Sequence, residues 1–102
     1  MTFTGSLYNA IMPDIKSIEL KIGHFYKFRR KYPRIFYYFR VTGISLEAGK
    51  YNVNGFIVQE GRIGTPHIED AILPTKLLSK GKITNITEEL FKKTLIRETL
   101  KQ

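Results

Sequence analysis

Residues 20–41 read LKIGHFYKFRRKYPRIFYYFRV, and the periodicity of this stretch decides the fold. Apolar side chains recur at every second position, first over residues 20–29 and again over residues 34–41. Successive side chains of a β-strand point to opposite faces, so a period of two predicts two strands. Pro33 has no backbone N–H to give to a ladder, so residues 30–33 are expected to form the turn of a β-hairpin.

The alternation divides this predicted hairpin into two faces. We expect the first face to be core, and it carries Ile22, Tyr26, Phe28, Ile35, Tyr37, Phe39 and Val41. The second face carries Lys21, Phe25, Lys27, Arg29, Arg34, Phe36, Tyr38 and Arg40. Cations and aromatic rings therefore alternate on one side of a single hairpin.

Shorter strands are expected to follow the hairpin. Gly43 marks a bulge or bend, because the apolar phase changes there. Residues 51–58 predict a third strand whose phase changes at Gly55. A fourth strand is expected from about residue 62 to Pro66, at a sheet edge because of the proline. Another short strand is expected over 72–78.

The C-terminal segment predicts a helix that begins after Asn85 or Thr87, either of which can cap it. The negative charges of Glu88 and Glu89 interact favourably with the positive N-terminal end of the helix dipole. The expected buried stripe consists of Leu90, Phe91, Thr94 and Leu95. Ile96 and Leu100 fall on a different side of this helix.

Strands in meander order followed by one helix predict a mainly β fold of the α+β class. We expect a small, strongly bent antiparallel sheet, or an SH3-like or OB-like partly open barrel. A short helix over residues 6–12 is also expected, because Pro13 would end it. With 102 residues, the chain is expected to form a single domain over residues 1–102.

Charge is concentrated in the hairpin. Residues 21–40 hold seven Lys or Arg and no acid, against a net charge of +8 for the whole chain. A basic surface of this kind favours a polyanionic partner. The chain has no cysteine, and no apolar run approaches the roughly 20 residues that a membrane span needs. A cytoplasmic protein without integral membrane association is therefore expected.

Rings that stack on bases and cations that neutralise phosphates are what single-stranded nucleic acid requires. The sequence thus predicts a small nucleic-acid-binding domain, with single strands favoured and duplex binding left open. The candidate contact residues are Lys21, Phe25, Lys27, Arg29, Arg30, Lys31, Arg34, Phe36, Tyr38 and Arg40.

Two other interpretations remain open from the sequence. Aromatic residues at alternate positions commonly pair across strands, and Phe36 and Tyr38 could pack beneath the C-terminal helix. The chain could also be a protein-binding accessory module that uses sheet edges and the helix. Its partner would then be an acidic protein or a second copy of the chain, which makes a homo-oligomer possible.

Catalytic chemistry has little support. The chain has two histidines, His24 and His67, and neither belongs to a recognisable cluster of metal ligands. His24 falls on the apolar face and is expected to be partly buried. Glu69 and Asp70 are adjacent in sequence, so they point to different faces and do not make an acid/base pair. No enzyme activity, metal or cofactor is expected.

Overall fold

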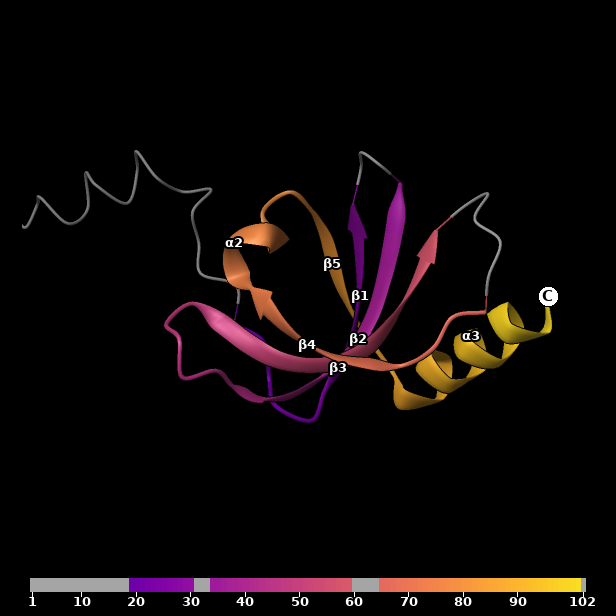
Figure 1. Ribbon diagram of the computed structural model, residues 1–102, viewed down its shortest axis with the longest axis horizontal. Helices are drawn as coiled ribbons and strands as arrows, with labels where there is room; N and C mark the ends of the chain where they lie inside the picture. Colours follow the sequence, from indigo (N-terminus) through magenta and orange to yellow (C-terminus); the bar gives the residue numbers. More distant parts are fainter. Residues whose placement is uncertain (1–18, 31–33, 60–64, 102) are drawn as a thin grey trace, which may run out of the picture.

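The computed structural model describes residues 19–30, 34–59 and 65–101 (Figure 1). It has a five-stranded sheet in the order β4-β3-β2-β1-β5, in which every pair of neighbours is antiparallel. The strands are β1 (Phe25–Arg30), β2 (Ile35–Ile44), β3 (Lys50–Gln59), β4 (Glu69–Pro74) and β5 (Gly81–Ile86). The helices are α2 (Thr75–Leu78) and α3 (Glu88–Leu100). The predicted mainly β fold with a bent antiparallel sheet and a C-terminal helix is confirmed.

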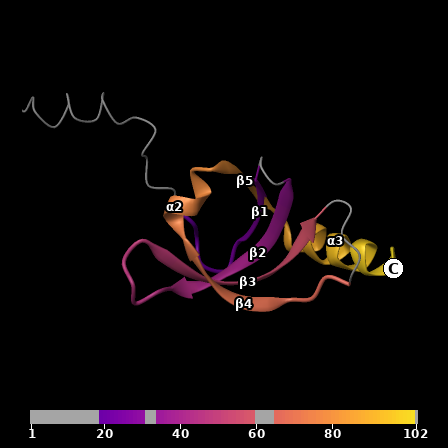
Figure 2. The same ribbon diagram turned by 45° about the horizontal axis from the view of Figure 1, so that its top comes forward.

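The sheet buries apolar side chains on both of its faces. The inner face, which packs against α2, is built on Leu20, Tyr26, Phe28, Phe39, Val41, Val53, Leu73 and Leu78. The outer face, which packs against α3, is built on Tyr38, Phe56 and Phe91. The two helices lie at opposite ends of the curved sheet (Figure 2). The central strands therefore carry side chains of two separate cores.

The hairpin of β1 and β2 has the two faces that the sequence predicted. Tyr26, Phe28, Phe39 and Val41 are all buried on the inner face. The register pairs Tyr26 with Phe39, and the Tyr26 and Phe39 rings stack at 5.7 Å. Cross-strand ring pairs of this kind stabilise a sheet by about 0.2–1 kcal/mol each. The bulge expected near Gly43 is also present, as a register shift after Val41.

The beginning of the first strand was predicted too early. β1 begins at Phe25, and the chain turns before it at Gly23, whose φ is +87°. A left-handed backbone ends the strand alternation, because most L-residues avoid this conformation. His24 is consequently exposed, not partly buried, and Ile22 is 55% exposed and outside the core.

The third strand contains no irregularity at Gly55. The change of phase in its sequence arises because β3 is covered on both sides, with Val53 in the inner core and Phe56 in the outer core. A strand buried on both faces reads as an apolar run instead of a strict alternation.

The segments after the third strand differ from the prediction. The fourth strand expected from about residue 62 to Pro66 lies mostly outside the described residues, and residues 65 and 66 are not in a strand. The edge strand beside β3 is β4, which begins at Glu69. The strand expected over 72–78 ends at Pro74 and continues as α2. Residues 81–86, which the sequence analysis left without an element, form β5 and pair with β1.

Helix α3 begins as expected. The Thr87 hydroxyl caps it by accepting a hydrogen bond from the Leu90 backbone N–H at 3.1 Å, whereas Asn85 belongs to β5. In the expected stripe, Phe91 and Thr94 are buried, Leu95 is half-buried, and Leu90 is exposed. No helix in the described part of the chain is long and apolar enough to cross a membrane. The helix expected over residues 6–12 lies outside the described residues.

Candidate nucleic-acid interface

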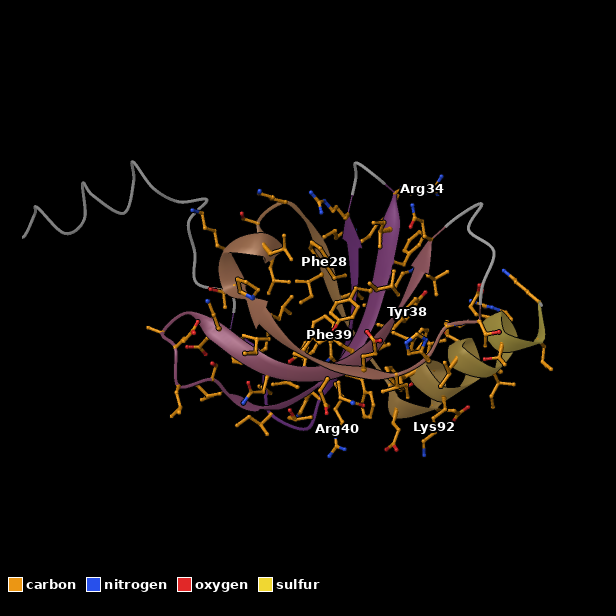
Figure 3. All side chains as sticks on the ribbon, viewed as in Figure 1. Phe28, Arg34, Tyr38, Phe39, Arg40 and Lys92 are labelled. Atoms are coloured by element: carbon orange, nitrogen blue, oxygen red, sulfur yellow. The ribbon has the colours of Figure 1, made fainter. Side chains whose placement is uncertain are left out.

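A group of basic side chains lies on the outer face where the β1–β2 hairpin meets β5. Arg29 is directly opposite Lys82 in the β1–β5 ladder, and Lys27 is two residues before Arg29 on the same side. Directly opposite residues of an antiparallel pair share a face. Arg34 lies at the start of β2, at the upper end of the sheet (Figure 3). We call the set Lys27, Arg29, Arg34, Phe36 and Lys82 the hairpin patch.

The ring of Phe36 holds two of these cations in place. The Lys27 Nζ lies 5.1 Å from the centroid of this ring, and the Arg34 Cζ lies 5.9 Å from it. Phe36 itself is half-buried against the outer core. Each such cation–π contact stabilises by about 0.5–1 kcal/mol at an exposed site. The ring therefore gives two flexible side chains a preferred position at the surface.

Three cations of the hairpin patch, Lys27, Arg29 and Lys82, have no acidic partner among the described residues, since no carboxylate there lies within ion-pairing distance of them. Glu98 of α3 lies near Tyr38, but its Oε2 already accepts from Lys101 at 3.0 Å and from Arg97 at 3.4 Å. Uncompensated cations on neighbouring strands produce a local positive potential that attracts anions.

The Tyr38 ring lies beneath α3. Only 7% of Tyr38 is exposed, and its ring stacks on Phe56 at 5.2 Å with an interplanar angle of 9°. Phe56 in turn meets the edge of Phe91 at 5.1 Å, and Phe25 contacts Phe91 at 5.0 Å. Packing under the C-terminal helix, the alternative that the sequence left open for Phe36 and Tyr38, therefore holds for Tyr38, whereas Phe36 is only partly buried against this cluster. Phe25, which that alternative did not include, also packs on Phe91.

Burial also changes the acidity of this tyrosine. Desolvation beneath α3 raises the pKa of Tyr38 above its usual 10.0, with an opposing effect of Arg97 and a further increase from Glu98. Below pH 10 the phenol is neutral in the folded and in the unfolded protein. The full contribution of Tyr38 to the free energy of unfolding is therefore present below this pH. That contribution is lost as the pH rises from 10 through the higher pKa of the folded protein.

We expect this shift to be visible in an alkaline titration. In the native protein Tyr38 should ionise at a higher pH than in the urea-unfolded chain, as followed by phenolate absorbance. Burial, with a smaller effect of Glu69, also raises the pKa of Tyr37, so two late-titrating tyrosines are expected within the described part of the chain. The Tyr38→Phe variant should lose one of them; an unchanged titration curve in this variant would contradict the assignment.

Besides Phe25 and Tyr38, three of the predicted residues do not join the hairpin patch, namely Lys21, Arg30 and Arg40. Arg40, in the middle of β2, lies well away from Arg34 (Figure 3), with its Cζ 5.9 Å from the Phe25 ring centroid. Arg40 also lies near Glu88, whose pKa is lowered mainly by its hydrogen bond to Lys92 and only slightly by Arg40.

The other two lie apart for different reasons. Lys21 is exposed in the turn that precedes β1. Arg30 has the parity of Phe28 and belongs to the inner face. Lys31 lies outside the described residues. The continuous basic surface expected along the whole hairpin is thus divided, and its upper part is the larger group.

Lys82 is the member of the hairpin patch that sequence reasoning missed. It could be recognised only after residues 81–86 had been identified as a strand beside β1. The signal was present in the β-branched residues Ile83, Thr84 and Ile86, which favour a strand. The strand was not recognised because Asn85 had been interpreted as a possible cap of the C-terminal helix.

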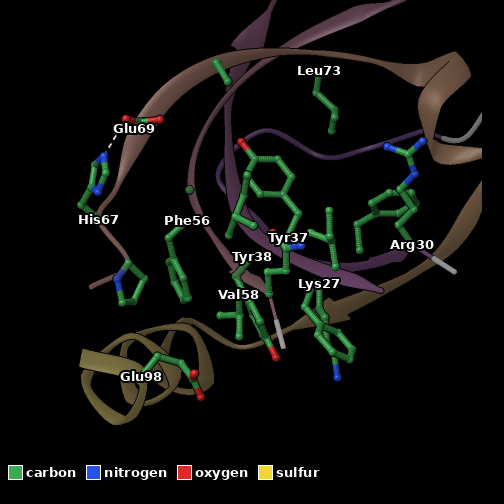
Figure 4. A pocket seen from close by; sticks show the side chains of 18 of the residues that line it. Lys27, Arg30, Tyr37, Tyr38, Phe56, Val58, His67, Glu69, Leu73 and Glu98 are labelled. Atoms are coloured by element: carbon green, nitrogen blue, oxygen red, sulfur yellow. Dashed lines mark hydrogen bonds and ion pairs between the residues drawn. The ribbon is translucent and has the colours of Figure 1, made fainter. Parts of the chain in front are cut away.

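An open cavity of about 1240 Å³ extends between β4 and the hairpin (Figure 4). Its lining includes Arg30, Tyr37, Tyr38, Phe56 and Leu73. Polar contacts among the lining residues include the exposed pair between His67 Nε2 and Glu69 Oε1 at 2.6 Å. No three acidic or histidine side chains among the described residues are grouped as metal ligands.

No family model, curated protein or solved structure matches this chain. The candidate interface consists of four cations and one ring on or next to three adjacent strands.

Proposed function

We propose that the chain is a small, non-enzymatic nucleic-acid-binding domain that acts in the cytoplasm and contacts its ligand through the hairpin patch. The observation that carries this proposal is the grouping of Lys27, Arg29 and Lys82 without acidic partners among the described residues. Lys and Arg that contact phosphates release condensed counterions, and this release drives binding. Arg34 adds a guanidinium, which can pair with a phosphate through two parallel hydrogen bonds.

We also propose that the fold is an SH3-like, partly open barrel. The strand order supports this, because four strands follow one another as a meander and the fifth returns beside the first. The short helix α2 stands between β4 and β5, and its Leu78 fills the inner core. An SH3-like form leaves the outer face of the hairpin accessible beside α3.

Removing charge from the hairpin patch should weaken nucleic-acid binding strongly. In the variant Arg29→Gln, Arg34→Gln, Lys82→Gln, three phosphate contacts are lost. The slope of log affinity against log salt on duplex should then become shallower by about 2.7, since each contact contributes about 0.9. At about 0.1 M salt this corresponds to a loss of affinity of roughly 500-fold. Fluorescence anisotropy at several salt concentrations measures both quantities.

The matched control removes the same charge elsewhere. Lys76→Gln, Lys92→Gln, Lys93→Gln changes three exposed lysines on α2 and α3 and leaves the net charge equal to that of the first variant. Its salt slope should stay within about 0.5 of the unchanged protein, because lysines that do not touch phosphate release no counterions. Equal losses in the two variants would show that net charge alone, and not the hairpin patch, governs binding.

A second candidate function, a protein-binding accessory module, is favoured by one observation. Ile96 and Leu100 are 59% and 77% exposed and lie on the side of α3 that faces away from the sheet. Exposed apolar side chains one helical turn apart are typical of a helix that packs against a partner.

Self-association through α3 is directly measurable. If this helix mediates a homodimer, the protein should sediment as a dimer, and the variant Ile96→Asp, Leu100→Asp should be monomeric with an unchanged circular dichroism spectrum. A monomer at micromolar concentration before any substitution would reject the homodimer.

A further inference from the structure

We propose that the hairpin patch recognises the phosphate backbone of double-stranded nucleic acid and does not read bases. This inference rests on the proposed function and specifies its ligand. It replaces the preference for single strands that the sequence suggested, because that preference required aromatic rings open to solvent.

The three rings expected to stack on bases are already engaged within the protein. Tyr38 is stacked on Phe56, and Phe25 is packed on Phe91 under α3. Phe36 is half-buried, with Lys27 and Arg34 placed over its ring. Proteins that bind single strands depend on successive bases stacking on exposed aromatic side chains. This outer face offers no row of such rings among the described residues.

Cationic side chains on short spacings are the groups that remain for a ligand. Lys27 and Arg29 are two residues apart on one strand, which separates their Cα atoms by about 6.6–6.8 Å. Arg29 and Lys82 are directly opposite on neighbouring strands, about 5 Å apart. Such spacings gather several charges on an area a few residues wide, which suits closely spaced phosphates.

Charge density then favours the duplex. Double-stranded DNA carries one negative charge per about 1.7 Å of its axis, and each neutralised phosphate contributes a salt slope of about 0.9, against about 0.7 for a single strand. For four contacts at about 0.1 M salt, this difference predicts duplex binding that is roughly sixfold tighter. Binding should also be indifferent to base sequence, because phosphate contacts carry no sequence information directly.

The test compares oligonucleotides of equal length and composition. The unmodified protein is titrated against two labelled 20-base-pair duplexes of unrelated sequence and against their separate strands. We expect the two duplexes to bind within about twofold of each other and each to bind about sixfold more tightly than its strands. Tighter binding to single strands would overturn the inference but would leave the proposed function standing.

The variant Phe36→Leu provides an independent readout. Leucine keeps the apolar support for the Lys27 and Arg34 stems but removes the ring, so duplex affinity should change by less than about threefold. If Phe36 stacked on bases, the variant would lose about fivefold or more, and only for single strands. That selective loss would also overturn the inference.

Polyglutamate of matched length tests both proposals together. Binding to it as tight as to the duplex would overturn both the inference and the proposed function, since the hairpin patch would then attract polyanions of any kind. No binding to duplex or single strand at about 50 mM salt would also overturn both, because the electrostatic contribution is large there.

Discussion

Replacing Phe91 with alanine is expected to destabilise the protein by about 3–5 kcal/mol, a large fraction of the 5–15 kcal/mol that holds a domain of this kind together. Phe91 is 6% exposed and contacts both Phe25 and Phe56 with its ring. It joins α3 to the outer face, where Tyr38 and Phe56 are the other buried members of the cluster among the described residues. Deleting the ring leaves a cavity that neighbours on a rigid sheet cannot fill.

Ile96→Ala is the matched control on the same helix. Ile96 is exposed on the far side of α3, so its truncation removes little buried area and should cost less than about 1 kcal/mol. Urea unfolding followed by tyrosine fluorescence and by circular dichroism measures both variants. Similar costs for the two substitutions would mean that α3 does not pack on the sheet through Phe91.

Gly55→Ala is expected to cost about 3 kcal/mol, at the upper end of the range for overpacking. A Cβ at this position would lie 2.1 Å from the Tyr38 carbonyl oxygen and 2.7 Å from the Cα and Cβ of Phe39. The clash is with the backbone of the neighbouring strand, so no side-chain rotation relieves it. Either β2 moves away from β3 or the ladder breaks at its centre.

Gly43→Ala provides the comparison within the same pair of strands. The nearest atom that its Cβ would meet is Asn52 Nδ2 at 3.8 Å, an ordinary contact. Reduced freedom of the unfolded chain should make this substitution neutral or stabilising by up to about 1 kcal/mol. Thermal unfolding of the two variants should therefore shift in different directions, and a large loss for both would contradict this account of Gly55.

The sequence predicted the hairpin well because its alternation is long and nearly unbroken. Residues 25–30 and 35–41 fell on the correct faces, and the bulge at Gly43 was marked by a change of phase. The helix cap at Thr87 was likewise visible as a local signal, since capping depends on residues only three positions apart.

Long-range pairing could not be predicted from the same signals. The partner of β1 on its free side is β5, which is more than 50 residues away in sequence and has only two half-buried positions flanked by exposed ones. The candidate surface depended on this pairing, because Lys82 joins Arg29 only through it. The covering of the outer-face rings by α3 also depends on tertiary packing, so local sequence signals could not predict it.

The lack of space for a Cβ at Gly55 and at Gly81 also affects the register of the strands. A strand with one polar face is aligned by that face, since a shift of one residue would expose its apolar set. Here β2 and β3 carry buried apolar side chains on both faces, such as Tyr38 and Phe39 on β2, so this form of selection is weaker. At Gly81 a Cβ would lie 2.8 Å from the Phe28 ring and 2.2 Å from the Arg29 carbonyl oxygen. The two glycines therefore act as register markers: displaced by one residue, each ladder would place a side chain where only hydrogen fits.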